Sequence, residues 1–290
     1  MSILHVIILA VVQGLAELLP VSSSAHVVVA EKLMGLDPSS PPMTLLLVML
    51  HTGTMFAVIV YFWREWRGAY FQSGEAFKRF AGLIILATVL TGAVGEALIK
   101  VIEKTAFRGL PQAEIEDLFS HLELVAPALA IAGVLILTAG ILEKRRSAEL
   151  RAEAADMNAK QAGLIGAVQG LCLPFRGFSR SGATISTGML AGVAKSRAET
   201  FSFALAVVLT PPVVLREALR LVRAEHSAGA AASLGSAAFL SIVGAVFAFL
   251  AGLLALKWLS GWLERGRWHL FGIYCLIAAV AVAVLHQAGY

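Results

Sequence analysis

Charged residues are scarce in this sequence. Only 14% of its 290 residues are Asp, Glu, Lys or Arg, whereas soluble domains have about 25%. Cysteine is nearly absent as well, because Cys172 and Cys275 are the only two and neither lies at zinc-ligand spacing from another cysteine or histidine. This scarcity argues against a soluble domain, a disulfide framework and a cysteine-based metal centre. The first residues also lack the basic region of a cleaved signal peptide, so we expect them to be retained.

Apolar residues are abundant instead. They make up 58% of the chain, and the mean hydropathy is +0.81, values that indicate an integral membrane protein. The net charge of +4 is explained by basic loops, and we expect no nucleic-acid partner. Six stretches reach the length of about 20 apolar residues that crosses a bilayer. They are Met43–Trp63, Arg79–Lys100, Leu122–Leu142, Glu199–Val222, Ser233–Lys257 and Trp268–Ala288.

Two further apolar stretches, Ile3–Leu36 and Ala162–Val193, are longer than one span and are interrupted by polar motifs. The first motif, Val12–His26, reads V-Q-G-L-A-E-L-L-P-V-S-S-S-A-H. The second, Val168–Thr184, reads V-Q-G-L-C-L-P-F-R-G-F-S-R-S-G-A-T, and a shift of 156 positions places the two V-Q-G-L segments on each other. We therefore expect each stretch to form a helix–break–helix hairpin that enters and leaves the membrane on the same side.

Basic residues indicate the orientation of the spans. Fourteen of the 23 lie in the loops 64–79, 143–160, 195–199 and 257–267, seven lie on the opposite side, and two belong to the second motif. The positive-inside rule places those four loops in the cytoplasm. Residues 1–142 (hairpin 3–36 plus three spans) and 162–290 (hairpin 162–193 plus three spans) then have opposite topologies and are joined by a charged connector, 143–161. The sequence thus predicts an all-α polytopic membrane protein, an inverted-topology repeat of six transmembrane helices plus two re-entrant hairpins, with a site where the halves meet.

The second motif has the features of an anion site. Its segment G-F-S-R-S-G, Gly177–Gly182, begins an apolar helix, so that free backbone N–H groups gather at the helix start. Arg180 adds a planar fork suited to two phosphate oxygens, and an arginine at membrane depth needs a counter-charge. The alternative is a structural arginine paired with a carboxylate such as Glu17. Arg176 could be a second phosphate contact or could reach the lipid headgroups.

The first motif adds groups that could act on a phosphorus atom. Ser23, which the 156-residue shift aligns with Ser179, lies three residues before His26, so the two share a face of a helix. His26 could be a general base, an acid, a nucleophile or merely a satisfied buried histidine. Glu17 could orient the imidazole across the break or help to hold a divalent cation.

Three further polar residues give weaker indications of function. His51 could line the pocket or serve helix packing. Gln13 and Gln169 occupy matched positions, and we expect them to cap backbone groups freed by the breaks.

The two motifs resemble those of a known family. E-L-L-P-V-S-S-S-A-H, Glu17–His26, is similar to the E-F-L-P-V-S-S-T-G-H box of the undecaprenyl pyrophosphate phosphatases, the bacterial bacitracin-resistance phosphatases. G-F-S-R-S-G-A-T-I-S-T-G-M-L-A-G-V, Gly177–Val193, resembles their second box nearly letter for letter. M-L-H-T-G-T-M-F-A-V-I-V-Y-F-W-R, Met49–Arg64, resembles the stretch after the first box. The resemblance covers essentially the whole chain.

The resemblance implies hydrolysis of a C55 polyprenyl diphosphate to the monophosphate carrier lipid and inorganic phosphate, in the recycling of cell-wall precursors. It implies a multi-pass protein of the bacterial cytoplasmic membrane whose site opens to the outer face, and a divalent cation, Mg²⁺ or Ca²⁺, with Glu17 as a ligand. Whether the chain forms a homodimer stays open. By motif position, the catalytic residues would be Glu17, Ser23, His26 and Arg180. The expected substrate contacts are Ser22, Ser24, His51, Arg176, Gly177, Ser179, Ser181, Gly182 and Thr184.

Three departures from the family pattern concern the site. Gln13 stands where the family often has a second glutamate, which predicts weaker cation binding or none. Ala25 replaces a glycine, and Arg176 replaces a proline. An alternative interpretation is a transporter or flippase for a polyprenyl phosphate, because inverted repeats with broken helices also build transporters. A lipid-binding scaffold without catalysis is a third.

Overall fold

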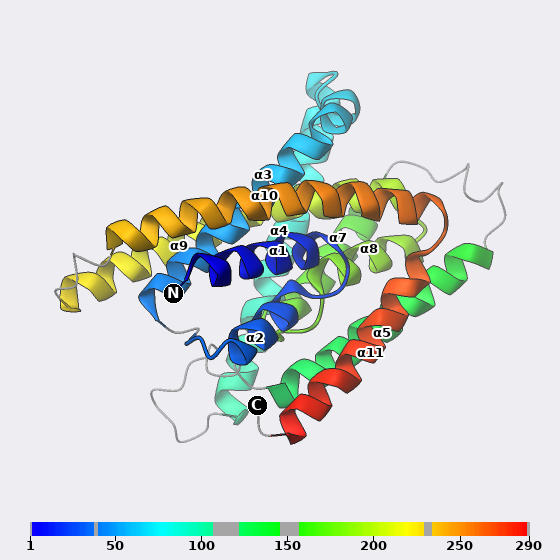
Figure 1. Ribbon diagram of the computed structural model, residues 1–290. Helices are drawn as coiled ribbons and strands as arrows, with labels where there is room; N and C mark the ends of the chain where they lie inside the picture. Colours follow the sequence, from blue (N-terminus) through cyan, green and yellow to red (C-terminus); the bar gives the residue numbers. More distant parts are fainter. Residues whose placement is uncertain (1, 38–39, 107–121, 146–156, 229–233, 289–290) are drawn as a thin grey trace.

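The computed structural model describes residues 2–37, 40–106, 122–145, 157–228 and 234–288. In these ranges the secondary structure is helical throughout, without a strand (Figure 1). Five helices are long and apolar enough to cross a membrane: Pro42–Tyr70, Gly74–Thr105, Glu123–Arg145, Ala237–Glu264 and Trp268–Gln287. The expectation of an all-helical, multi-pass membrane protein is confirmed.

The first half begins with the expected interrupted pair of helices. Helix α1 spans Ile3–Leu18 and starts at Ser2, whose hydroxyl accepts a hydrogen bond from the backbone N–H of His5. The chain leaves the helix before Pro20, because proline cannot donate the next helical hydrogen bond. Helix α2, Ser23–Leu33, follows after this short break. Three long helices complete the half: α3 (Pro41–Tyr70), α4 (Gly74–Ala106) and α5 (Leu122–Arg145).

The second half repeats this order. Helix α7 (Ala159–Cys172) starts at a capping box made by Asn158 and Gln161, and α8 (Arg180–Leu190) follows after a longer break. Three long helices come next: α9 (Lys195–Ala228), α10 (Leu234–Glu264) and α11 (Trp268–Gln287). The expected span Glu199–Val222 lies within α9, which is not among the five apolar helices found in the described residues. Residues 146–156, most of the expected connector, lie outside the described ranges.

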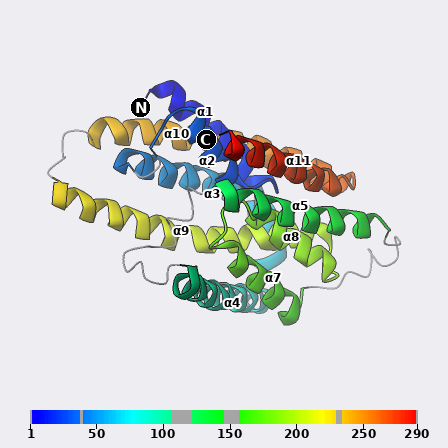
Figure 2. The same cartoon turned by 90° about the horizontal axis from the view of Figure 1, so that it is seen from below.

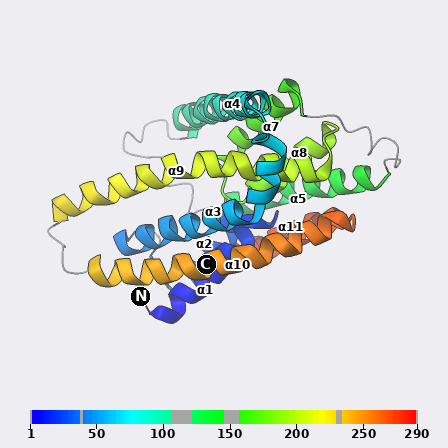
Figure 3. The same ribbon diagram turned by 90° about the horizontal axis from the view of Figure 1, so that it is seen from above.

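The two halves interlock. The main helix pairs, α5 with α11, α3 with α10, α1 with α10 and α4 with α7, each take one helix from each half. Figure 1 shows α5 beside α11, and Figure 2 shows α7 beside the end of α4. From above, α9, α3 and α10 lie in succession (Figure 3). Each half therefore packs its main helices against the other half, and this packing brings the two helix breaks together.

Small residues make this interlocking possible. A Cβ atom on Gly53 of α3 would collide with the backbone carbonyl of Ala245 on α10, and one on Gly166 of α7 would collide with that of Ala87 on α4. Close backbone approach at glycine is a general way for membrane helices to gain van der Waals contact, since lipid offers no hydrophobic driving force between them.

Gly53 tests this packing. Gly53→Val should destabilise the protein by about 1–3 kcal/mol or more, because the α3 and α10 backbones must separate. Gly92→Val is the matched control, since Gly92 lies in the membrane helix α4 and a Cβ atom added there would have no neighbour within 4 Å. Thermal unfolding in detergent measures both variants. Equal melting temperatures would contradict the packing described here.

Candidate active site

Glu17, in the last turn of α1, joins the two halves of the protein. Its Oε1 accepts a hydrogen bond from Nη2 of Arg180 at 2.7 Å, and the two groups form an ion pair. Its Oε2 accepts from the hydroxyl of Ser23 at 2.5 Å and from Nε2 of Gln13 at 3.2 Å. The side chain is only 15% exposed. One carboxylate therefore accepts hydrogen bonds from a guanidinium, a hydroxyl and an amide at the point where both helix breaks meet.

The two break-side partners of Glu17 hold equivalent places in the two halves. Ser23 is the first residue of α2, and Arg180 is the first residue of α8. Each follows a serine with positive φ, Ser22 at 68° and Ser179 at 36°, which are the only such residues other than glycine in the described ranges. The sequence shift aligned Ser23 with Ser179, but the structure matches Ser22 with Ser179, because the distance from V-Q-G-L to this serine is one residue longer in the second motif. Left-handed backbone at non-glycine residues is costly and is concentrated at functional sites.

The two breaks also bond directly to each other. The backbone N–H of Gly177 donates to the hydroxyl of Ser24 at 3.3 Å, and the hydroxyl of Ser181 donates to the carbonyl of Leu19 at 3.2 Å. The hydroxyl of Ser24 lies 3.2 Å from that of Ser22. These hydrogen bonds bring serine hydroxyls and backbone groups of both motifs together in one cluster.

The start of α8 is arranged as an anion site. The hydroxyl of Ser179 accepts from the backbone N–H of Gly182 at 3.3 Å, which orders the first turn. A Cβ atom on Gly182 would touch Ile136, so the helix start packs closely against α5. The expected structural pairing of Arg180 with Glu17 is present, yet it uses one guanidinium nitrogen. The other, Nη1, is buried and has no hydrogen-bond partner in the described residues. That nitrogen can still bind an incoming oxygen.

The histidines take different positions. His51 of α3 has its Nε2 3.8 Å from Oε2 of Glu17, so it borders the same carboxylate. His26 does not bond to Glu17. Its Nδ1 lies 2.7 Å from the carbonyl oxygen of Ser22, and its Nε2 lies 2.6 Å from the hydroxyl of Tyr274 on α11. Tyr274 was missed by sequence reasoning, although a hydroxyl in an otherwise apolar helix is a signal that could have identified it.

Some expected contacts are not brought to the Glu17 cluster. The hydroxyl of Thr184 lies 2.6 Å from that of Ser202 on α9 and is buried there. The charge of Arg176 acts on Glu31, a buried carboxyl group of α2.

The glutamines do not cap broken backbone as expected. The amide nitrogen Nε2 of Gln13 donates to Oε2 of Glu17, and that of Gln169 donates to the hydroxyl oxygen of Thr91, so both acceptors are side-chain oxygens. The expectation was therefore wrong for their amide nitrogens, because each one donates to a side-chain oxygen of a packed helix instead of to a backbone carbonyl.

The donor set at this cluster does not suit a divalent cation held by protein carboxylates. Glu17 is its one acidic group, and both of its oxygens already accept hydrogen bonds. Gln13 directs an amide N–H, which repels a cation, toward the carboxylate. In the described residues no group of three or more His, Cys, Asp or Glu side chains could hold a metal ion. Hard cations prefer several oxygen ligands, and this cluster offers one carboxylate whose two oxygens are already bonded.

A cavity of about 480 Å³ lies apart from the motifs, between α3, α5, α9 and α10. Its charged side chains are Lys195 and the four glutamates Glu65, Glu143, Glu199 and Glu264. Acidic side chains outnumber the single ammonium group, which does not favour a diphosphate, so size alone does not make this cavity the phosphate site.

Comparison with known proteins agrees with the motifs. The family model described as bacitracin resistance protein BacA matches residues 6–281. The chain is 58% identical to undecaprenyl-diphosphatase 2 of Acinetobacter baylyi over 98% of both chains. It is 30% identical to undecaprenyl-diphosphatase of Bacteroides fragilis over 97% of both chains, and 32% identical to that of Methanosphaera stadtmanae over 98% of both. With a match across nearly its full length, the chain belongs to the bacitracin resistance protein BacA family.

Proposed function

We propose that this protein hydrolyses undecaprenyl diphosphate, or a closely related polyprenyl diphosphate, to the monophosphate lipid and inorganic phosphate. The relatives bearing the undecaprenyl-diphosphatase name support this activity. The single observation that carries it is the cluster in which Arg180 and Ser23, from opposite halves, bond to the two oxygens of Glu17. It places an anion-binding group next to a hydroxyl and its base.

Arg180 and the start of α8 bind the diphosphate in this proposal. The unpartnered Nη1 supplies a charged donor, and the positive end of α8 favours an anion at the helix start, where the N–H of Gly182 is already bonded to Ser179. Donors fixed in a water-poor site stabilise the charge that grows on the transferred phosphoryl group. The substrate competes with Glu17 for the guanidinium, and this competition frees the carboxylate to act as a base.

Ser23 is the nucleophile that the geometry favours. Its hydroxyl already donates to Glu17 at 2.5 Å, the arrangement of a nucleophile and its general base. The Ser23 oxygen attacks the terminal phosphorus, its proton passes to Glu17, and the bond to the bridging oxygen breaks. The polyprenyl monophosphate leaves, and water then hydrolyses the phosphoserine to inorganic phosphate. His26 serves this second step as the base that takes a proton from water.

The transporter alternative has no observation in its favour. The same cluster would coordinate a phosphate during transport, but transport does not require a hydroxyl that donates to a carboxylate. The relatives quoted above are named as diphosphatases.

The membrane arrangement belongs to the same proposal. We place α1–α2 and α7–α8 as re-entrant hairpins of opposite sense, with α9 as the sixth span, residues 1–142 and 162–290 as the two repeats, and the cytoplasmic membrane as the location. The turn between α3 and α4 and that between α10 and α11 then face the cytoplasm, and the substrate site opens to the outer face. The loop charges and the repeated helix order support this arrangement. Homodimer formation has no structural support here and is not part of the proposal.

Removing either the phosphate-binding guanidinium or the imidazole base should greatly slow turnover. Arg180→Ala should lower phosphate release by about 10²–10³-fold, because the growing charge loses its main donor. His26→Ala should lower it by a similar factor. Arg64→Ala, at an exposed position near the proposed cytoplasmic end of α3, serves as the control. The assay follows phosphate release from C55 diphosphate by purified protein in detergent, and near-normal turnover of the two site variants would refute the assignment.

We propose that Gln13 frees the enzyme from a strict need for a divalent cation. The wild-type protein should then retain most of its rate in excess EDTA. Gln13→Glu should make the rate depend on added Mg²⁺ or Ca²⁺, because it supplies a second carboxylate one helical turn from Glu17. Gln13→Ala separates the loss of the amide from the gain of the carboxylate. Complete inhibition of the wild-type protein by EDTA would contradict this proposal.

Single cysteines can test the topology in intact cells. Ser73→Cys, in the turn after α3, should react only with membrane-permeant thiol reagents. Lys32→Cys, at the end of α2, should react with impermeant ones, because the first hairpin opens to the outer face whereas the turn between α3 and α4 faces the cytoplasm. Identical labelling at both positions would exclude the topology proposed for the first repeat.

A further inference from the structure

Both ring nitrogens of His26 are engaged, and their partners determine where the proton lies. Nδ1 is 2.7 Å from the carbonyl oxygen of Ser22, and a carbonyl can only accept. The proton of the neutral imidazole is therefore on Nδ1. Nε2 then carries the lone pair and accepts a hydrogen bond from the hydroxyl of Tyr274 at 2.6 Å.

The helix break fixes one side of this arrangement. Ser22 has φ of 68° and precedes α2. Its carbonyl oxygen accepts from the backbone N–H of His26 at 3.4 Å as well as from the imidazole. The left-handed turn and the first turn of α2 together hold the ring where its Nε2 reaches Tyr274 of α11.

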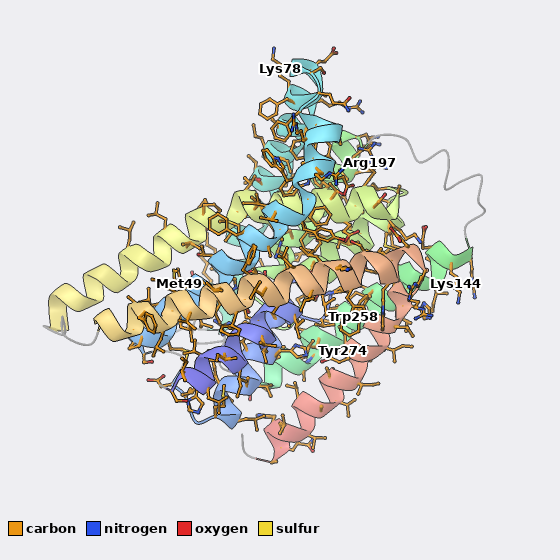
Figure 4. The ribbon with its side chains drawn as sticks, turned by 45° about the horizontal axis from the view of Figure 1, so that its top comes forward. Met49, Lys78, Lys144, Arg197, Trp258 and Tyr274 are labelled. Carbon is orange, nitrogen blue, oxygen red and sulfur yellow. The ribbon has the colours of Figure 1, made fainter. Side chains whose placement is uncertain are left out.

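Helix α11 fixes the other side. The ring of Tyr274 lies nearly parallel to the imidazole, with centroids 5.7 Å apart and planes inclined by 12°. The next residue, Cys275, donates through its thiol to the carbonyl of Pro20 at 3.4 Å. Two consecutive residues of α11 therefore contact the break between α1 and α2, which sets the register of this helix against the catalytic motif. Figure 4 labels Tyr274 on α11.

We propose that Tyr274 is a positioning residue for His26: its hydroxyl holds the imidazole in the form with a proton on Nδ1 and a free acceptor at Nε2. This inference rests on the proposed role of His26 as a base. When substrate and water enter, a water molecule takes the place of the tyrosine hydroxyl at Nε2, and the ring is already in the form that accepts its proton. Without Tyr274 the ring could turn or change tautomer, and part of the population would present N–H where an acceptor is needed.

A tyrosine that only fills space on a membrane helix would predict a different result. Phenylalanine fills nearly the same volume, so a purely packing role survives Tyr274→Phe. A role through the hydroxyl does not. The control is Tyr61→Phe, which removes another tyrosine hydroxyl, one that bonds to Ser260 beside the separate cavity.

The test combines kinetics with the state of the imidazole. Tyr274→Phe should lower kcat by about tenfold, the rate equivalent of one hydrogen bond, with little change in KM. The double variant with His26→Ala should be no slower than His26→Ala alone, because the tyrosine acts through the histidine. Tyr61→Phe should behave as the wild type. In ¹⁵N-histidine spectra, with His26→Ala used to assign the signals, wild-type Nε2 should be unprotonated, and Tyr274→Phe should populate the other tautomer.

The outcomes separate this inference from the proposed function. Full activity of His26→Ala would refute the proposed role of His26. Loss of activity in His26→Ala together with wild-type kinetics and an unchanged tautomer in Tyr274→Phe would refute the positioning role alone. Multiplicative losses in the double variant would also overturn it, because Tyr274 would then act independently of His26.

Discussion

The ion pair between Glu17 and Arg180 is the contact on which the rest of the site depends. Its partners lie 163 positions apart, at 2.7 Å, and both are mostly shielded from solvent. Removing one partner from a buried pair costs about 3–5 kcal/mol, since the other charge is left uncompensated. Because each partner lies at the break of one half, the pair obliges both breaks to meet at the same place. Because the breaks meet there, the serines and backbone groups beside them also bond to each other.

The pairing of helices across the halves explains how such a cluster can exist at membrane depth. Irregular backbone is tolerated there only where protein groups satisfy it. Here Ser24 and Ser181 satisfy the opposite break, and glycines such as Gly53 allow the long helices to close around both. The same construction serves enzymes and transporters. The hydroxyl of Ser23, bonded to a carboxylate beside a partly free guanidinium, is what favours hydrolysis.

Much of the site could be predicted from the sequence because its groups lie in short local motifs. The helix starts and the pairing of Arg180 with Glu17 follow from spacing and from membrane cost, whereas Glu17 was expected to orient His26 and instead accepts from Ser23. Three features could not be predicted, because they depend on which helices pack together. Tyr274 reaches His26 from 248 positions away, Thr184 turns to α9, and Arg176 acts on Glu31. The extra residue between V-Q-G-L and the positive-φ serine of the second motif also became visible only in the helix starts.

The central claim is that groups from both halves hold one diphosphate. A structure with a non-hydrolysable polyprenyl methylenediphosphonate bound tests it most directly. The account predicts the terminal phosphonate within hydrogen-bond distance of the Arg180 guanidinium and the first N–H groups of α8, with the Ser23 oxygen facing its phosphorus. A phosphonate bound away from both breaks, for example beside Lys195 in the separate cavity, would contradict it.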